Sequence, residues 1–317
     1  MGLFNHFKGK DNTNLINCHE GEKVPEFLKF ATSREMPIAR IPGPFSYSIF
    51  PSVHSFELFK ARRPLSLEDC LFDENGMGIP LLVMKEPPNY MPDPLFFSPT
   101  YQYEIHCYEI RTITDPPPYQ KHELVSSMNT HKLYLTSYAS VCQTTKSGRY
   151  HFDITIENKE DSPVSMIGDN SLFLFDTSIS GHVFRWTQKI FALQTKIKLT
   201  LVNDQFPTFF DSDAEFKHKM KNRPSDVAKF SATIGQYARK ESAFFRKVRK
   251  VGTLSIGEDE ENISKLGLDG CDEYKKLFAI EALLIHFVTD KRDTDFQGNN
   301  SGLINTAVYL GSPFFAF

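Results

Sequence analysis

The chain has 317 residues, 40% of them hydrophobic, so it is long enough for one large domain or two small ones around a sizeable core. Its formal net charge of -3 at pH 7 gives no overall attraction to nucleic acid. The five cysteines, Cys18, Cys70, Cys107, Cys142 and Cys271, are scattered without a CxxC pair. We therefore expect reduced thiols, and the absence of a signal-peptide pattern at the first residues likewise favours a cytosolic protein.

Residues 1–94 are interrupted by prolines too often for long regular elements. Pro37, Pro42, Pro44, Pro51, Pro64 and Pro80 recur through this stretch. Apolar residues such as Phe45, Phe50 and Phe56 remain frequent, which is typical of a packed arm rather than a disordered tail. A denser group of prolines between Pro87 and Pro99 then marks the clearest boundary. The sequence predicts a Pro-rich, loop-rich N-terminal arm over 1–94 and a separate domain over 95–317.

Strand patterns follow one another after this boundary. In the stretch 151–157, Phe152, Ile154 and Ile156 alternate with polar residues, which is the period of a strand with one buried face. Further candidates are 101–113, 132–142, 171–177, 182–187, 195–203, 227–233, 248–256 and the last residues, 304–317. No crossover helices separate them. Many short strands with turns between them predict a mainly β fold, as a barrel or sandwich.

One long helix is predicted near the C-terminus, at about 272–290. The segment from Leu277 to Val288 is apolar almost all round, so the helix must be enclosed by protein or lipid. Its apolar run is about 12 residues, whereas a bilayer span needs roughly 20. We therefore expect a sheet wrapped around this helix.

These elements resemble a known family. Phe184-Arg-Trp186, Thr195–Leu199, Val227–Phe230 and Lys250–Ile256, followed by a late hydrophobic helix, are similar to fungal tubby C-terminal-like proteins. That superfamily also contains LURP-one-related and scramblase-like proteins. The resemblance covers roughly 95–317 and implies a closed β-barrel threaded by a hydrophobic helix. It further implies attachment to membranes or lipids, through a cationic pocket that binds phosphoinositide headgroups.

Two tetrapeptides carry the sharpest functional signal. Pro87-Pro88-Asn89-Tyr90 and Pro116-Pro117-Pro118-Tyr119 both fit PPxY, the ligand class of WW domains, and composition predicts about 0.04 chance matches. Successive prolines hold a polyproline II helix that stacks in an aromatic groove, and the tyrosine fills a second pocket. The alternative is two rigid turns with Tyr90 and Tyr119 packed inward. Such motifs resemble the docking sites of adaptors for HECT-class ubiquitin ligases.

A basic segment is the second signal. It contains Arg239, Lys240, Arg246, Lys247, Arg249 and Lys250, with aromatic residues just before its second half. Cations beside aromatic residues suit an anionic membrane surface. The alternatives are a solvated strand edge guarded by lysine, or nucleic acid. An acidic run, 258–261, follows and would weaken attraction to nucleic acid, so no nucleic-acid partner is expected.

No catalytic motif was found, and we expect neither enzymatic activity, a metal nor a cofactor. Asp211 with Asp213, and Asp293 with Asp295, do not fit a calcium loop. His286 lies in the predicted helix and is interpreted as a hydrogen-bonded core residue. The sequence thus favours a cytosolic, non-enzymatic adaptor that presents PPxY motifs to a WW-domain ubiquitin ligase. The alternatives are a peripheral module that binds phosphoinositides or other anionic lipids, and a protein without a specific partner.

Overall fold

The computed structural model describes the chain in segments, which together hold most of its regular structure. They are residues 33–41, 47–61, 78–85, 101–157, 163–169, 174–188, 196–202, 206–221, 233–239, 248–258, 263–264, 268 and 271–299. Side chains at 188, 196, 220, 233, 234, 271–273 and 291–299 are outside this description.

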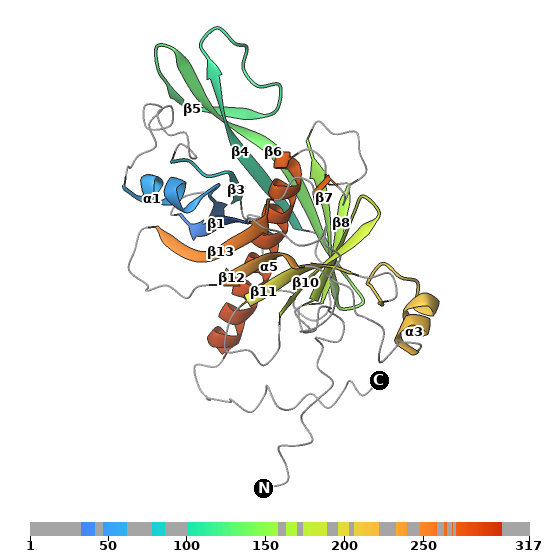
Figure 1. The fold of residues 1–317 in the computed structure, drawn as a ribbon. Coiled ribbons are helices and arrows are strands. Elements are labelled where there is room, and N and C mark those ends of the chain that lie inside the picture. Colours follow the sequence, from blue (N-terminus) through green and yellow to red (C-terminus); the bar gives the residue numbers. More distant parts are fainter. Residues whose placement is uncertain are drawn as a thin grey trace.

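Thirteen antiparallel strands form one sheet, and twelve of them close into a barrel (Figure 1). The strands are β1 (Ser33–Arg40), β2 (Tyr47–Ile49), β3 (Leu82–Lys85), β4 (Tyr101–Thr112), β5 (His122–Ser127), β6 (His131–Lys146), β7 (Arg149–Ile156), β8 (Val164–Asp169), β9 (Leu174–Ile179), β10 (His182–Gln188), β11 (Lys196–Leu201), β12 (Thr233–Arg239) and β13 (Arg249–Gly257). The order runs β4-β3-β2-β1-β13 and then down from β12 to β6, and pairing of β4 with β6 closes the ring. The predicted mainly β fold is confirmed as a closed barrel.

Alternation along the strands decides which residues enter the barrel. On β7, Phe152 and Ile154 are buried while Asp153 and Thr155 are exposed. Because successive strand residues point to opposite faces, each strand contributes apolar side chains to the interior and polar ones to the outer surface.

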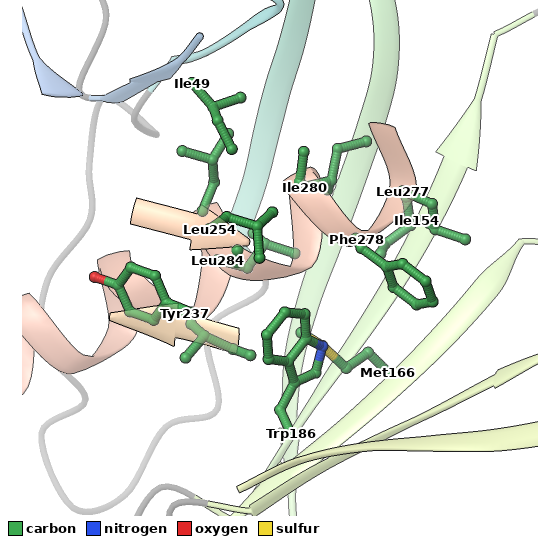
Figure 2. Close-up of a cluster of buried hydrophobic side chains, with 14 of the residues drawn as sticks. Ile49, Ile154, Met166, Trp186, Tyr237, Leu254, Leu277, Phe278, Ile280 and Leu284 are labelled. Carbon is green, nitrogen blue, oxygen red and sulfur yellow. The ribbon is translucent and has the colours of Figure 1, made fainter. Parts of the chain in front are cut away.

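Helix α5 (Cys271–Asn299) runs between the strands of the barrel (Figure 1). Every side chain from Leu277 to Thr289 is buried. Figure 2 shows Phe278 and Leu284 of α5 among Trp186, Tyr237 and other buried side chains of the strands. No helix in the described part of the chain has the length and apolarity that crossing a membrane requires.

The predicted loop-rich arm contributes directly to the barrel. Strands β1, β2 and β3 all lie within residues 1–94, together with helix α1 (Val53–Ala61), so the sheet does not follow the boundary expected at 94/95. Pro37 lies inside β1, and its carbonyl oxygen accepts a bond of 2.9 Å from Phe50 N just beyond the end of β2. Its missing N–H faces this same side, so proline removes only the reciprocal bond at the last rung of the β1–β2 ladder and leaves the pairing of β1 with β13 intact.

Strands β4, β5 and β6 form an extension that projects from the barrel (Figure 1). β3 pairs with β4 only at Glu104–His106, whereas β6 pairs with the whole length of β4. The first part of β6 pairs with β5 and its second part with β7. The far half of β4, the first part of β6 and all of β5 therefore make a small sheet outside the ring.

Candidate partner-docking loop

The second PPxY motif lies in the loop that joins β4 to β5, within this extension. Thr112 is the last residue of β4 and His122 the first of β5. The loop begins with a turn in which Thr112 N donates to Asp115 Oδ2 at 3.1 Å and Asp115 N donates to Thr112 O at 3.2 Å. Hydrogen bonds that the carboxylate of Asp115 accepts from the side chain and from the backbone N–H of Thr112 lower the pKa of this carboxyl. The turn fixes where the proline run starts.

The backbone of the loop is anchored on both sides of the motif. Arg111 Nη1 donates to Pro116 O at 2.8 Å, while Arg111 Nε is 2.6 Å from Glu109 Oε1. At the far end, Ser137 N on β6 donates to Lys121 O at 2.8 Å. Because the loop is held at its start and end, the motif is presented in a defined arrangement rather than on a free tail.

Exposure differs sharply along the motif. Tyr119 is 94% exposed, Pro116 and Pro117 are exposed, and Pro118 is buried. The residues that PPxY recognition uses thus face solvent, and the variable position between them packs inward. The alternative in which Tyr119 packs inward is wrong. Pro87, Pro88 and Tyr90 of the first motif lie outside the described residues.

Other exposed apolar side chains gather on the same extension. Of the five large hydrophobic residues exposed in the described part of the chain, Ile113, Tyr119, Leu124 and Val125 lie between β4 and the middle of β5. The β5–β6 register shifts between Leu124 and Ser126, which leaves Val125 in a bulge. Sequence reasoning missed this apolar group, although two adjacent apolar residues on a short strand would have signalled a second apolar face.

In the described part of the chain, the cations of the basic segment lie on different faces of the sheet. Arg249 and Lys250 are neighbours on β13 and so point to opposite faces of the sheet. Arg239 Nη2 lies 3.0 Å from Asp290 Oδ1 of α5, which makes it half of an ion pair. Lys240, Arg246 and Lys247 lie outside the described residues. Strand alternation thus separates cations that are adjacent in sequence, and the candidate lipid site stays a prediction.

Polar groups are also buried inside the barrel. Trp186 Nε1 donates to Glu281 Oε2 at 2.6 Å, and burial raises the pKa of Glu281 to about 8, against opposing hydrogen bonds from Trp186 and Thr177. His286 is buried and hydrogen-bonded to Tyr237, so its interpretation as a hydrogen-bonded core residue is confirmed. Burial lowers the pKa of His286 well below its usual range despite the Asp290 carboxylate nearby, so the ring is neutral at pH 7. Sequence reasoning missed Glu281, although a single carboxyl within an apolar helix would have indicated a buried polar contact.

A buried ion pair ties the loop at 206–209 to the outer side of β9 and β10. Arg185 Nε and Nη2 lie 2.5 and 2.6 Å from the two carboxylate oxygens of Asp176, and Nη2 also donates to Pro207 O at 2.8 Å. Phe209 N donates to Asp176 Oδ2 at 2.8 Å. The guanidinium of Arg185 and the carboxylate of Asp176 are both paired and hydrogen-bonded within the protein, so we interpret this ion pair as structural.

The acidic pairs considered for metal binding have other roles or lie outside the description. Asp211 accepts from Thr208 N at 2.7 Å and pairs with Lys219 Nζ at 2.7 Å. Ser212 and Glu215 form a reciprocal capping box at the start of α3 (Asp213–Lys221). No group of three or more metal-ligating side chains occurs among the described residues. The side chains of Asp293 and Asp295 are not described, and Cys107 and Cys142 are free thiols.

Comparison with known proteins identifies the family and overturns the tubby-like resemblance. The DIA1 family model matches residues 31–294, and no tubby or LURP-one family was found. The chain is 26% identical over 293 residues to Protein DIA1 of Saccharomyces cerevisiae (strain ATCC 204508 / S288c), covering 88% of this chain and 85% of that protein. It is 24% identical over 281 residues to the uncharacterized protein YOR385W of the same yeast, covering 88% and 93% of the two chains. No solved structure matches. The resemblance, which rested on four short segments and one hydrophobic helix, is wrong, and the chain belongs to the DIA1 family.

Proposed function

We propose that this protein is a non-enzymatic cytosolic adaptor that presents PPxY motifs to WW domains of HECT-class ubiquitin ligases. The observation that supports this most is the 94% exposure of Tyr119 beside two exposed prolines. Removing a large apolar side chain from water stabilises a folded protein or a complex by about 1.5–3 kcal/mol, and the folded chain does not bury the ring of Tyr119. A partner that covers this ring would gain that free energy on binding.

The loop chemistry fits the requirements of a WW groove. Each residue before a proline is disfavoured in the α region, so Asp115, Pro116 and Pro117 are each restricted to extended conformations. Proline rings then stack on aromatic side chains of the partner without a large ordering cost, and the tyrosine enters a neighbouring pocket. The anchors at Arg111 and Lys121 reduce that cost further, since the loop is already ordered.

The surrounding apolar residues favour a contact larger than the motif itself. Leu124 is 51% exposed and Ile113 is 48% exposed on the same extension. Exposed apolar residues gathered on one region are typical of partner surfaces, whereas single scattered ones carry no such meaning. The first motif, at Pro87, Pro88 and Tyr90, would add a second site, and two linked sites raise apparent affinity when both reach one ligase.

The proposal is tested by capture of the full-length protein on isolated WW domains of HECT-class ligases. We expect Tyr119→Ala to weaken capture strongly and Tyr119→Ala/Tyr90→Ala to abolish it. If Tyr119→Ala alone abolishes capture, WW-domain binding is assigned to the loop between β4 and β5. A remaining signal that disappears only in the double variant would assign a share to the first motif.

The matched control is Val53→Ala, which removes an exposed apolar side chain of α1, outside the extension and both motifs. It should keep motif-dependent capture within a few-fold of the unmodified protein. Thermal unfolding of all variants checks that the fold persists, since removing an exposed side chain changes stability by only about 0.5 kcal/mol. Capture that survives in the double variant would refute the proposal.

A further inference from the structure

Three arginines project to the same end of the barrel interior. Arg40 lies two residues after Ile38 on β1, and Arg239 lies two residues after Tyr237 on β12. Ile38 and Tyr237 belong to the interior core, and alternate strand residues share a face, so both arginines point inward. Arg249 is the cross-strand partner of Arg40 and therefore shares its face. We call these three residues the arginine mouth.

The arginine mouth surrounds one carboxylate. Asp290 of α5 pairs through Oδ1 with Arg239 Nη2 at 3.0 Å and accepts from the Tyr47 hydroxyl through Oδ2 at 2.7 Å. The Arg40 guanidinium lies 6.0 Å from the centre of the Tyr47 ring, so it belongs to the same cluster. Arg239 is paired with this carboxylate, whereas no ion pair joins Arg40 or Arg249 to a carboxylate among the described residues, so the charges of these two guanidinium groups are in excess there.

One of these guanidinium groups contains a buried N–H donor without an acceptor among the described residues. Arg249 Nε is buried and has no hydrogen-bond partner among the described residues. A buried donor without an acceptor is costly, and such groups in folded proteins call for an explanation such as a missing ion. His286 adds no further positive charge to the mouth, because burial keeps its ring neutral. The unused donor and the excess charge point to the same kind of ligand.

The mouth is open to solvent. Arg40 is exposed, and the side chains of Arg239 and Asp290 are 22% and 21% exposed. A ligand from solution can therefore reach Arg40 and the partly exposed Arg239, and half-buried Arg249 lies directly beside Arg40 on the neighbouring strand. Partial burial also makes charge-assisted hydrogen bonds stronger than they are at a fully exposed surface.

We propose that the arginine mouth binds a phosphomonoester-type dianion, carried either by a soluble molecule or by a lipid headgroup. Guanidinium groups present planar pairs of donors that match phosphate oxygens. A phosphomonoester carries about −1.5 to −2 charges at pH 7, which balances the excess of two positive charges, whereas a carboxylate or a phosphodiester supplies only one. Sequence reasoning missed Arg40 because it lies in the Pro-rich stretch, far from the basic segment.

Titration of the full-length protein tests this site. We expect inorganic phosphate and glycerol 3-phosphate to raise the unfolding temperature in a concentration-dependent way, as a ligand of the folded state does. Co-sedimentation with vesicles of phosphatidylcholine mixed with phosphatidic acid tests the lipid source, and phosphatidylserine in place of phosphatidic acid controls for charge alone. Response to the soluble anions without sedimentation assigns a soluble ligand, and sedimentation with phosphatidic acid assigns a headgroup. No response in either arm, or equal sedimentation with phosphatidylserine, overturns the proposal.

The variants locate the binding. Arg40→Gln/Arg249→Gln should weaken it about tenfold or more, because two charge-assisted contacts are lost. Lys198→Gln/Lys250→Gln makes the same charge change on outward-facing positions of β11 and β13, and should leave binding within about twofold. Asp290→Asn removes the competing carboxylate and should tighten binding. Equal weakening in both double variants, or weaker binding in Asp290→Asn, overturns the assignment even where the arginine variant does not fold.

Discussion

Glu281 is a carboxyl group enclosed by the barrel, with Trp186 as its donor at 2.6 Å. Burial raises its pKa from 4.5 to about 8, so the folded protein holds a proton there that the unfolded chain releases at lower pH. Stability from this group is therefore present below pH 4.5 and is lost as pH rises towards 8. His286 acts in the opposite direction, because its lowered pKa adds stability as pH rises up to its unfolded value of 6.5.

The effect of Glu281 is clearest between pH 6.5 and about 8, above the range of His286. There the unmodified protein should lose stability, at most about 1.4 kcal/mol per pH unit from this group. Glu281→Gln keeps an oxygen for Trp186 and removes the titration, so its unfolding midpoint should fall less over this window. Urea unfolding at several pH values measures this. Parallel pH profiles of the two proteins would mean that Glu281 does not hold the proton.

Single residues were predicted unevenly. His286 was placed in the core correctly because an isolated histidine in an apolar helix needs a local partner, and Tyr237 supplies one. The exposure of Tyr119 was not decided by sequence, since a proline run fits a packed turn as well as a presented loop. What decides it is the extension of β4 and β6 beyond the ring, which depends on long-range pairing.

At the scale of elements, the position and enclosure of α5 could be predicted from its amino-acid composition more directly than those of any strand. Apolar residues on all sides require enclosure, and the observed helix, Cys271–Asn299, includes the predicted 272–290. The basic segment shows the opposite case. Its cations are close in sequence, but one strand distributes Arg249 and Lys250 to opposite faces, while Arg40 from a distant strand joins Arg249.

Leu284 tests the enclosure of α5, because its side chain is 0% exposed. Leu284→Asp places an unpaired charge in the barrel, at a cost of several kcal/mol, against a total stability of about 5–15 kcal/mol for a typical domain. We expect loss of cooperative thermal unfolding and of near-ultraviolet circular dichroism. Lys276→Asp, on the same helix but half-buried, is the control and should remain folded. A cooperative Leu284→Asp variant would place the helix at the surface.

At the scale of the whole molecule, the closed barrel needs strands from both sides of the predicted boundary. The mainly β class could be predicted from period-two alternation. The contribution of β1, β2 and β3 could not, because prolines such as Pro37 argued against strands, and only the three-dimensional ladder shows that the missing N–H of Pro37 falls at the end of the β1–β2 pairing. Closure by β4 and β6 likewise depends on long-range pairing.

A fragment of residues 95–317 should therefore fail to fold by itself. Without β1–β3, strands β13 and β4 each lose one of their two neighbours, the ring is opened, and one side of α5 loses its cover. We expect aggregation or non-cooperative unfolding of this fragment in circular dichroism and size-exclusion chromatography. A fragment of residues 31–299, which keeps every strand, should unfold cooperatively like the full chain. A stable, cooperative 95–317 fragment would show that the N-terminal strands are dispensable.

The most direct test of the adaptor account is calorimetric titration of the full-length protein with one isolated WW domain of the PPxY-binding class. The account predicts saturable binding that Tyr119→Ala weakens at least about tenfold, while Val53→Ala, on α1 outside the extension, leaves it within a few-fold. Equal affinity of the unmodified protein and Tyr119→Ala, or no binding by either, would contradict it.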